Sequence, residues 1–162
     1  MSEAPAKRTA KPVEWFAQTD GPENGKGLRF GCTMCGNCCS GPHGFVLIDD
    51  DELTALAKRL GITEQQFKDQ YTHMMELGRS LNEKKFGKAL DCVFLDRDKF
   101  PGKAVCGLYE DRPKQCRTWP FWSSVIASRE SWERSKKTCP GIDNGKLHTL
   151  TQIRVARDQI EM

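Results

Sequence analysis

The chain has 162 residues, of which 38% are hydrophobic and 29% charged, and its formal net charge is +3. This length suits one domain with a core of its own, and we predict a single domain over residues 13–162. Because basic residues are scattered among nearly as many acidic ones, we expect no nucleic-acid partner and no membrane surface.

Residues 1–12 are rich in alanine, proline and lysine and contain no apolar core of a signal peptide. We predict a flexible tail there and a cytoplasmic location. No apolar run approaches the ~18 residues of a transmembrane helix. Structural disulfides are rare in a reducing compartment, so the eight cysteines favour metal binding over a disulfide framework.

The first half of the chain predicts two short strands and two helices. Leu28–Phe30 is a short extended segment, and the apolar run Phe45–Ile48 is typical of a buried strand. Acidic residues 49–52 predict a helix start, and Gly61 predicts its end. Residues 63–66 fit a capping box, which predicts a second helix from Glu64 through Tyr71 to Met75.

The second half predicts two further strands and more helices. Residues 78–89 are expected to form a loop or a hairpin arm, and strands are expected at 92–95 and 104–109. Proline is tolerated in the first turn of a helix, so Pro113 predicts a helix that carries Cys116. Residues 123–136 and 149–160 complete the helices. The fold class expected is α+β: a small, loop-rich domain with two to three short strands and about four helices around a cysteine-ligated metal site.

Four of the cysteines fall within eight residues, at Cys32, Cys35, Cys38 and Cys39. Four thiols this close cannot all form disulfides with one another without strain. Thiolates two residues apart can instead converge on one cation or cluster. Four more cysteines stand singly, at Cys92, Cys106, Cys116 and Cys139.

The spacing of the cysteines is compatible with either an iron–sulfur cluster or a zinc site. Cys32, Cys35 and Cys38 match the three-cysteine loop of bacterial ferredoxin-type clusters, whose fourth ligand is often followed by proline, as Cys139 is here. Zinc takes four thiolates equally well, and ligand count does not choose between the metals. Eight cysteines also suffice for two centres, with Cys39 turned away from Cys38. Some remote cysteines could instead be small buried apolar side chains.

Neighbouring side chains in an extended backbone point to opposite faces, so Cys38 and Cys39 are not expected to reach one ion together. At least one ligand should then be remote, with Cys116 and Cys139 ranked first. Arg112 and Arg117 flank Cys116 and could offset thiolate charge, or could be solvated on a helix. Three aromatic residues follow and could shield a site or simply belong to the core: Trp119, Phe121 and Trp122.

Several motifs together resemble the YkgJ-type cysteine-cluster family, a zinc- or iron-chelating domain with a CxxCxxCC signature. They are the run at 32–39, Cys92-Val-Phe-Leu, Cys106-Gly-Leu-Tyr, and the segment from Arg112 through Cys116 to Phe121. The resemblance implies metal or iron–sulfur binding through these cysteines. The family is also labelled as Fe–S oxidoreductase, and a similar domain occurs in flagellin lysine methylases.

We therefore predict binding of a [4Fe–4S] cluster by Cys32, Cys35, Cys38 and one remote cysteine, with a redox or cofactor-supporting role. The alternatives are a zinc-binding structural or interaction module and a metal carrier. A redox or protein partner is expected, of unidentified nature. The sequence contains no glycine-rich nucleotide loop, and it assigns no enzymatic reaction.

Overall fold

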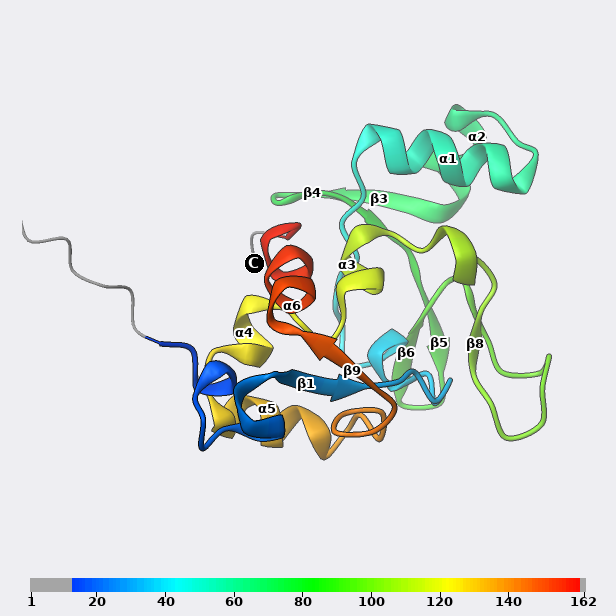
Figure 1. Cartoon of the computed structure of the whole chain (residues 1–162). Coiled ribbons are helices and arrows are strands. Elements are labelled where there is room, and N and C mark those ends of the chain that lie inside the picture. The colour runs from blue at the N-terminus through cyan, green and yellow to red at the C-terminus, as the bar shows by residue number, and fades with distance from the viewer. Residues whose placement is uncertain (1–12, 161–162) are drawn as a thin grey trace, which may run out of the picture.

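The structure is a computed structural model that describes residues 13–160. The tail predicted at residues 1–12 lies outside this range. The fold is a mixed α/β arrangement of short elements (Figure 1). The α-helices are α1 (Asp50–Leu60), α2 (Glu64–Tyr71), α3 (Lys114–Thr118), α4 (Ser123–Ile126), α5 (Arg129–Lys136) and α6 (Leu150–Asp158). The 3-10 helices are η1 (Trp15–Ala17), η2 (Pro22–Gly25), η3 (Asn37–Cys39) and η4 (Tyr109–Asp111).

The strands form small antiparallel sheets, and the described residues contain more strands than the two or three expected. They are β1 (Gly27–Phe30), β2 (Ser40–Gly41), β3 (Thr72–Met75), β4 (Gly78–Leu81), β5 (Glu83–Phe86), β6 (Ala89–Cys92), β7 (Leu95–Asp96), β8 (Val105–Cys106) and β9 (Lys146–Thr149). β1 pairs with β9, β3 with β4 and β7 with β8, and β6 lies between β2 and β5. The β1–β9 pair joins segments from opposite ends of the chain.

Three helices begin at reciprocal side-chain caps. Asp49, Thr63 and Thr149 each accept a hydrogen bond from the backbone N–H three residues on, and a Glu or Gln side chain at that position returns the bond. Such a capping box satisfies two helix N-terminal groups that would otherwise lack partners. α1 ends at Gly61, whose φ of 68° suits glycine at a helix C-terminus. These helix starts confirm the expectations from the sequence.

Several expected elements differ from the structure. The strand expected at 92–95 is instead the turn between β6 and β7, and the helix expected over 123–136 is divided into α4 and α5. α2 ends at Tyr71, and Thr72–Met75 turns into β3, which pairs with β4 across a hairpin. The run Phe45–Ile48 forms no strand but a single bridge, Leu47 to Ser80. Its backbone still bonds to the hairpin, because Leu81 N donates to Val46 O and Ile48 N donates to Arg79 O.

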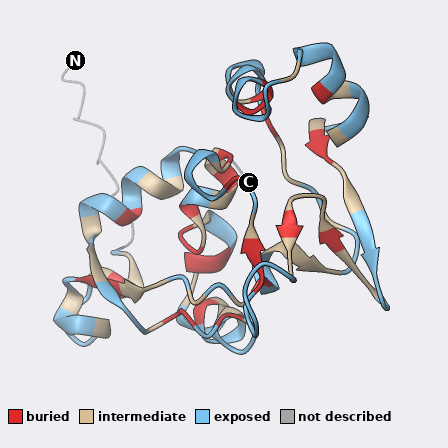
Figure 2. Ribbon diagram, turned by 90° about the vertical axis from the view of Figure 1, so that its right-hand side faces the viewer, coloured by how far each residue is buried: buried red, intermediate tan, exposed pale blue. Residues whose placement is uncertain are grey.

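The buried side chains form two cores, visible as separate groups of buried residues in Figure 2. The first core lies among η1, β1 and the C-terminal helices, around Trp132, Phe121 and Ile153. The second core lies beneath α1 and α2, around Phe67, Leu53 and Leu56. No helix among residues 13–160 is long and apolar enough to cross a membrane.

The capping box of α2 makes a direct prediction for stability. Replacing Thr63 with Ala removes the acceptor for Gln66 N, a bond of 3.1 Å. We expect Thr63→Ala to lower the free energy of unfolding by ~1 kcal/mol in chemical denaturation. Gln70→Ala changes an exposed position of the same helix and serves as the control. Equal stability of the two variants would contradict the role of the cap.

Candidate metal centre

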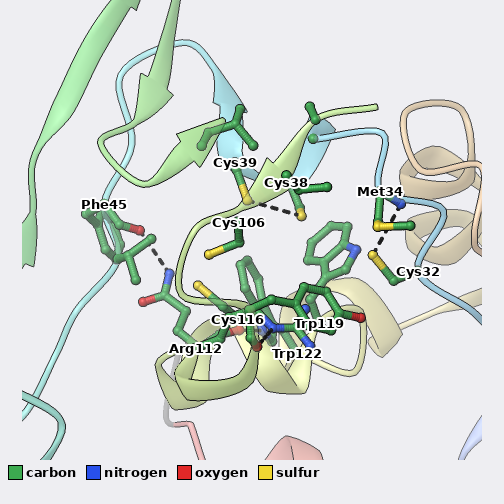
Figure 3. Close-up of a pocket in the computed structure, with 17 residues that line it drawn as sticks. Cys32, Met34, Cys38, Cys39, Phe45, Cys106, Arg112, Cys116, Trp119 and Trp122 are labelled. Atoms are coloured by element: carbon green, nitrogen blue, oxygen red, sulfur yellow. Dashed lines mark hydrogen bonds between the residues drawn. The ribbon is translucent and has the colours of Figure 1, made fainter. Parts of the chain in front are cut away.

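A pocket lies between the two cores, and most of the thiols line it. Its walls include Val46 and Cys106, which pack against the second core, and Trp119 and Trp122, which pack against the first. Figure 3 shows Cys38, Cys39, Cys106 and Cys116 around a common space, with Cys32 to one side next to Met34. The cysteines that line the pocket are Cys32, Cys38, Cys39, Cys106 and Cys116.

A tight turn brings the neighbouring Cys38 and Cys39 together. Gly36 precedes them with φ of 75°, a left-handed conformation that suits glycine, and a Cβ there would lie 2.5 Å from the Ala104 Cβ. Cys39 N donates to Gly36 O, and η3 turns both thiols into the pocket with their Sγ atoms 3.6 Å apart. The expectation that these side chains point apart is wrong, because it assumed an extended backbone where the chain forms a 3-10 turn.

The remote thiols of the pocket come from short elements held by tertiary contacts. Cys106 lies in β8 opposite Leu95 of β7. Cys116 lies in α3, as the sequence predicted. The side chain of Gln115 accepts a hydrogen bond from Leu47 N (2.9 Å) and donates one to Phe45 O (2.9 Å). These two bonds hold the backbone of the 45–47 segment against α3.

The other cysteines lie around this pocket. Cys92 ends β6 and borders a second pocket that also contains Cys38 and Cys39. Cys139 is 8% exposed within the first core, where its sulfur accepts a hydrogen bond from Trp119 Nε1 at 3.5 Å. Cys35 is half-buried and borders neither pocket. The pocket therefore brings together five of the eight predicted site residues, with Cys92 beside them.

All eight cysteines are free thiols in this structure. Across residues 13–160, no group of three or more His, Cys, Asp or Glu side chains stands in an arrangement that could hold a metal ion. The expected cysteine-ligated centre is thus not formed in this structure. The donors themselves suit a soft cation. Tetrahedral zinc–sulfur bonds of ~2.3 Å place two sulfurs about 3.8 Å apart, close to the 3.6 Å between Cys38 and Cys39.

The surroundings of the thiols give them different pKa values. The hydrogen bond from Cys39 lowers the pKa of Cys38 to about 7, and the same bond raises the pKa of Cys39. Burial raises the pKa of Cys92 to about 11 and also raises those of Cys106 and Cys116. Cys38 is therefore the thiol most readily ionised of this set.

One arginine supplies positive charge to the pocket. Arg112 lines it, stacks on the Tyr109 ring at 3.8 Å and favours the thiolate forms of Cys38, Cys106 and Cys116. Arg117 is exposed and does not line the pocket. Of the two arginines that flank Cys116, only Arg112 is therefore placed to offset thiolate charge in the pocket.

The sequence left two roles open for the aromatic residues after Cys116: shielding a site or belonging to the core. Trp119 and Trp122 line the pocket, with ring centroids 4.8 Å apart in an edge-to-face arrangement. Trp122 Nε1 donates a hydrogen bond to the backbone carbonyl of Gln115 at 2.9 Å, which holds the ring against α3. Phe121 is 4% exposed and belongs to the first core. The two tryptophans therefore form an apolar wall of the thiol pocket and also pack against the first core.

The structure also reveals supporting residues that the sequence did not indicate. Gln115 is one of them. Another is Asp91, 1% exposed and next to Cys92, which accepts two hydrogen bonds from Arg97 at 2.7 and 2.9 Å. Gln115 lies within the motif segment from Arg112 to Phe121, but neither role could be read from the sequence, because each residue acts through partners that are distant in the sequence or brought near by a turn. His43 pairs with Glu83 at 2.5 Å and does not face the thiols of the pocket.

Residues 31–140 match the model of the CxxCxxCC family, described as "Putative zinc- or iron-chelating domain". The match covers well over half of the chain, so the protein belongs to this family. This confirms the resemblance inferred from the cysteine motifs and supports metal binding, with zinc or iron as the metal. A comparison with solved structures gave no match.

The Gln115 side chain provides a test of how α3 is held. Gln115→Leu keeps a similar volume but leaves Leu47 N and Phe45 O without their partner. Because these groups are partly buried, we expect the free energy of unfolding to fall by about 2 kcal/mol and the Leu47 amide to exchange faster. Gln70→Leu makes the same chemical change at an exposed site and should have little effect. Unchanged exchange at Leu47 would rule out this role.

The Asp91–Arg97 pair predicts a pH-dependent stability. Hydrogen bonding from Arg97 lowers the pKa of Asp91, so the pair contributes fully above the unfolded-state pKa of ~3.9 and is lost as the pH falls through the lower folded-state value. We expect Asp91→Asn to cost about 3 kcal/mol at pH 7. The difference from wild type should shrink below about pH 4. Asp98→Asn, at an exposed position, is the control; a pH-independent difference would argue against the ion pair.

Proposed function

We propose that this protein holds a metal ion in a thiolate centre, with Cys38, Cys39, Cys106 and Cys116 as the ligands. The observation that carries the proposal is the separation of 3.6 Å between the Cys38 and Cys39 sulfurs inside a pocket with two further thiols opposite. Membership of a zinc- or iron-chelating family supports it.

The sulfur separation favours one metal ion over a cubane cluster. A [4Fe–4S] cluster is held by four cysteines, so each iron receives one thiolate. Two thiolates on a single ion are typical of mononuclear zinc and iron sites. The second candidate is the [4Fe–4S] cluster, which the spacing of Cys32, Cys35 and Cys38 supports, as does the position of Cys32 and Cys38 in the same pocket.

The surroundings of the pocket suggest what such a centre does. A thiolate-bound zinc supplies a structural cross-link, and a thiolate-bound iron supplies electron transfer. Arg112 offsets the thiolate charge from one side, while Trp119 and Trp122 form an apolar wall on another. Cys32 and Cys38 are exposed, so one side of the centre faces solvent. We infer a centre that stabilises the fold and can meet a redox or protein partner at that open side.

Purification without oxygen, followed by metal and sulfide analysis, distinguishes the candidates. We expect stoichiometric metal without inorganic sulfide. A brown protein that absorbs near ~400 nm and contains sulfide would replace the single ion with the cluster. A protein that purifies with no metal and takes up neither zinc nor iron afterwards would overturn the proposal.

The ligands are tested by single substitutions. We expect Cys106→Ser and Cys116→Ser each to remove the metal of this centre and to lower the melting temperature, because metal affinity and folding are coupled. Thr63→Ala lowers stability without touching the pocket and should keep its full metal content. If both cysteine variants retain all their metal and melt like wild type, the ligand assignment is wrong.

A further inference from the structure

Two turns near the thiol pocket each present an exposed phenylalanine between lysines. The β5–β6 hairpin turns at Lys85-Phe86-Gly87-Lys88, and the β7–β8 loop turns at Lys99-Phe100-Pro101-Gly102-Lys103. The Phe86 side chain is 51% exposed and that of Phe100 is 50% exposed. The loop that leads into β8 projects from the body of the molecule (Figure 1). One exposed apolar side chain is ordinary, whereas two at turns of similar composition point to a surface that binds something.

The turn that carries Phe100 has a fixed backbone. Pro101 holds its own φ through its ring. Gly102 has φ of 71°, a left-handed conformation that suits glycine, and Lys103 N donates to Phe100 O across the turn at 3.1 Å. Phe100 is therefore held outward before any partner arrives, and a pre-organised side chain loses less conformational entropy on binding.

Contacts join the two turns to each other and to the cysteine loop. Arg97, at the base of the β7–β8 loop, stacks on the Phe86 ring at 4.0 Å. At the other end of the same loop, Ala104 N donates to Met34 O at 2.9 Å. The side chain of Met34 is itself exposed. These contacts define one continuous loop-tip surface, made of Met34, Phe86, Lys88, Lys99, Phe100 and Lys103.

The loop-tip surface lies beside the open side of the thiol pocket. Lys103 Nζ donates to Thr33 O at 3.1 Å, and Met34 N donates to the sulfur of Cys32 at 3.4 Å. Figure 3 shows Met34 next to Cys32 at one side of the pocket. Because Cys32 is exposed, a molecule bound to the loop-tip surface would also contact the segment that carries this thiol.

Positive charge is concentrated in this part of the chain. Residues 84–103 contain six basic and three acidic residues, and their net charge of +3 equals that of the whole chain. One of the acidic residues, Asp91, is buried and bound to Arg97. The lysines of the loop-tip surface are exposed. Such a surface attracts acidic partners and raises their rate of association.

The composition of the surface favours a protein over a phosphate-bearing partner. Apolar side chains ringed by charged ones are the usual arrangement of a protein–protein interface, in which Phe, Met and Arg are enriched. The exposed carboxylate of Asp98 stands next to Lys99. It would repel the phosphates of a nucleic acid or of an anionic lipid. A folded protein can place one basic group there and acidic groups against the lysines.

We propose that the loop-tip surface docks an acidic protein partner, whose face carries carboxylates around an apolar centre. The apolar centre packs on Phe100 and Met34, and the carboxylates pair with Lys88, Lys99 and Lys103. The inference rests on the proposed function only for what the partner does at the open side of the centre. The docking surface itself contains no cysteine.

The test selects peptides on the full-length protein from a phage-displayed library of short random sequences. We expect enrichment of peptides in which acidic residues flank an aromatic or aliphatic one. An enriched peptide, labelled with fluorescein, is then titrated by fluorescence anisotropy. Lys88→Glu/Lys99→Glu should weaken its binding by ~10-fold at low salt, and Phe100→Ser should weaken it by ~10-fold. Added salt should weaken binding to wild type more than binding to the charge variant.

Matched variants at other exposed positions serve as controls. Lys26→Glu/Lys58→Glu makes the same change of charge away from the loop-tip surface. Leu77→Ser removes an exposed apolar side chain from the β3–β4 turn. Both control proteins should bind the peptide as wild type does. Equal weakening in the loop-tip and control variants would mean non-specific attraction and would overturn the proposal.

The remaining outcomes separate this inference from its alternatives and from the proposed function. Failure to enrich acidic peptides overturns it. So does tighter binding to phosphatidylserine-containing vesicles or to a single-stranded oligonucleotide that is lost in the loop-tip variants. Metal content is measured on the same samples. Protein with its metal but without peptide binding overturns this inference alone, whereas peptide binding by protein that takes up no metal overturns the proposed function alone.

Discussion

The position of helix α3 is the constraint on which the thiol pocket depends. A helix of five residues is not stable by itself, and α3 has no side-chain cap at its N-terminus. Other elements hold it instead: Glu52 of α1 accepts a hydrogen bond from Lys114 N at 2.6 Å, and Gln115 binds the backbone at Phe45 and Leu47. Cys116 is thus placed in the pocket by residues of α1 and of the 45–47 segment.

The pocket lies where the two hydrophobic cores meet, and this location connects metal binding with folding. One wall belongs to the second core through Val46 and Cys106, and the opposite wall belongs to the first core through Trp119 and Trp122. A metal held by Cys38, Cys39, Cys106 and Cys116 would join η3, β8 and α3 at this boundary. Each of these elements is only two to five residues long. Such a cross-link would therefore contribute more to the stability of the fold here than it would between long helices.

Local signals in the sequence predicted the helix starts well, because a capping box needs only residues within one turn. Asp49, Thr63 and Thr149 each cap the helix that was expected after them. Strands were harder to predict, since their partners are distant. Thr72–Met75 continues the helical pattern of α2, yet pairing with β4 makes it a strand. The prediction for Cys38 and Cys39 was wrong for a different reason: it assumed an extended backbone, whereas Gly36 begins a tight turn that brings the two side chains together.

The metal-binding chemistry of the site could be inferred from the cysteine spacing. Which cysteines line the pocket depends instead on tertiary packing. Cys116 was ranked among the first remote thiols and does line the pocket. Cys139, ranked with it because of the proline that follows, lies instead in the first core against Trp119. Cys106 reaches the pocket through the pairing of β7 with β8, which no spacing rule contains. Which thiols meet is therefore decided by residues such as Gln115 and Glu52, which carry no metal-binding chemistry but hold the walls in place.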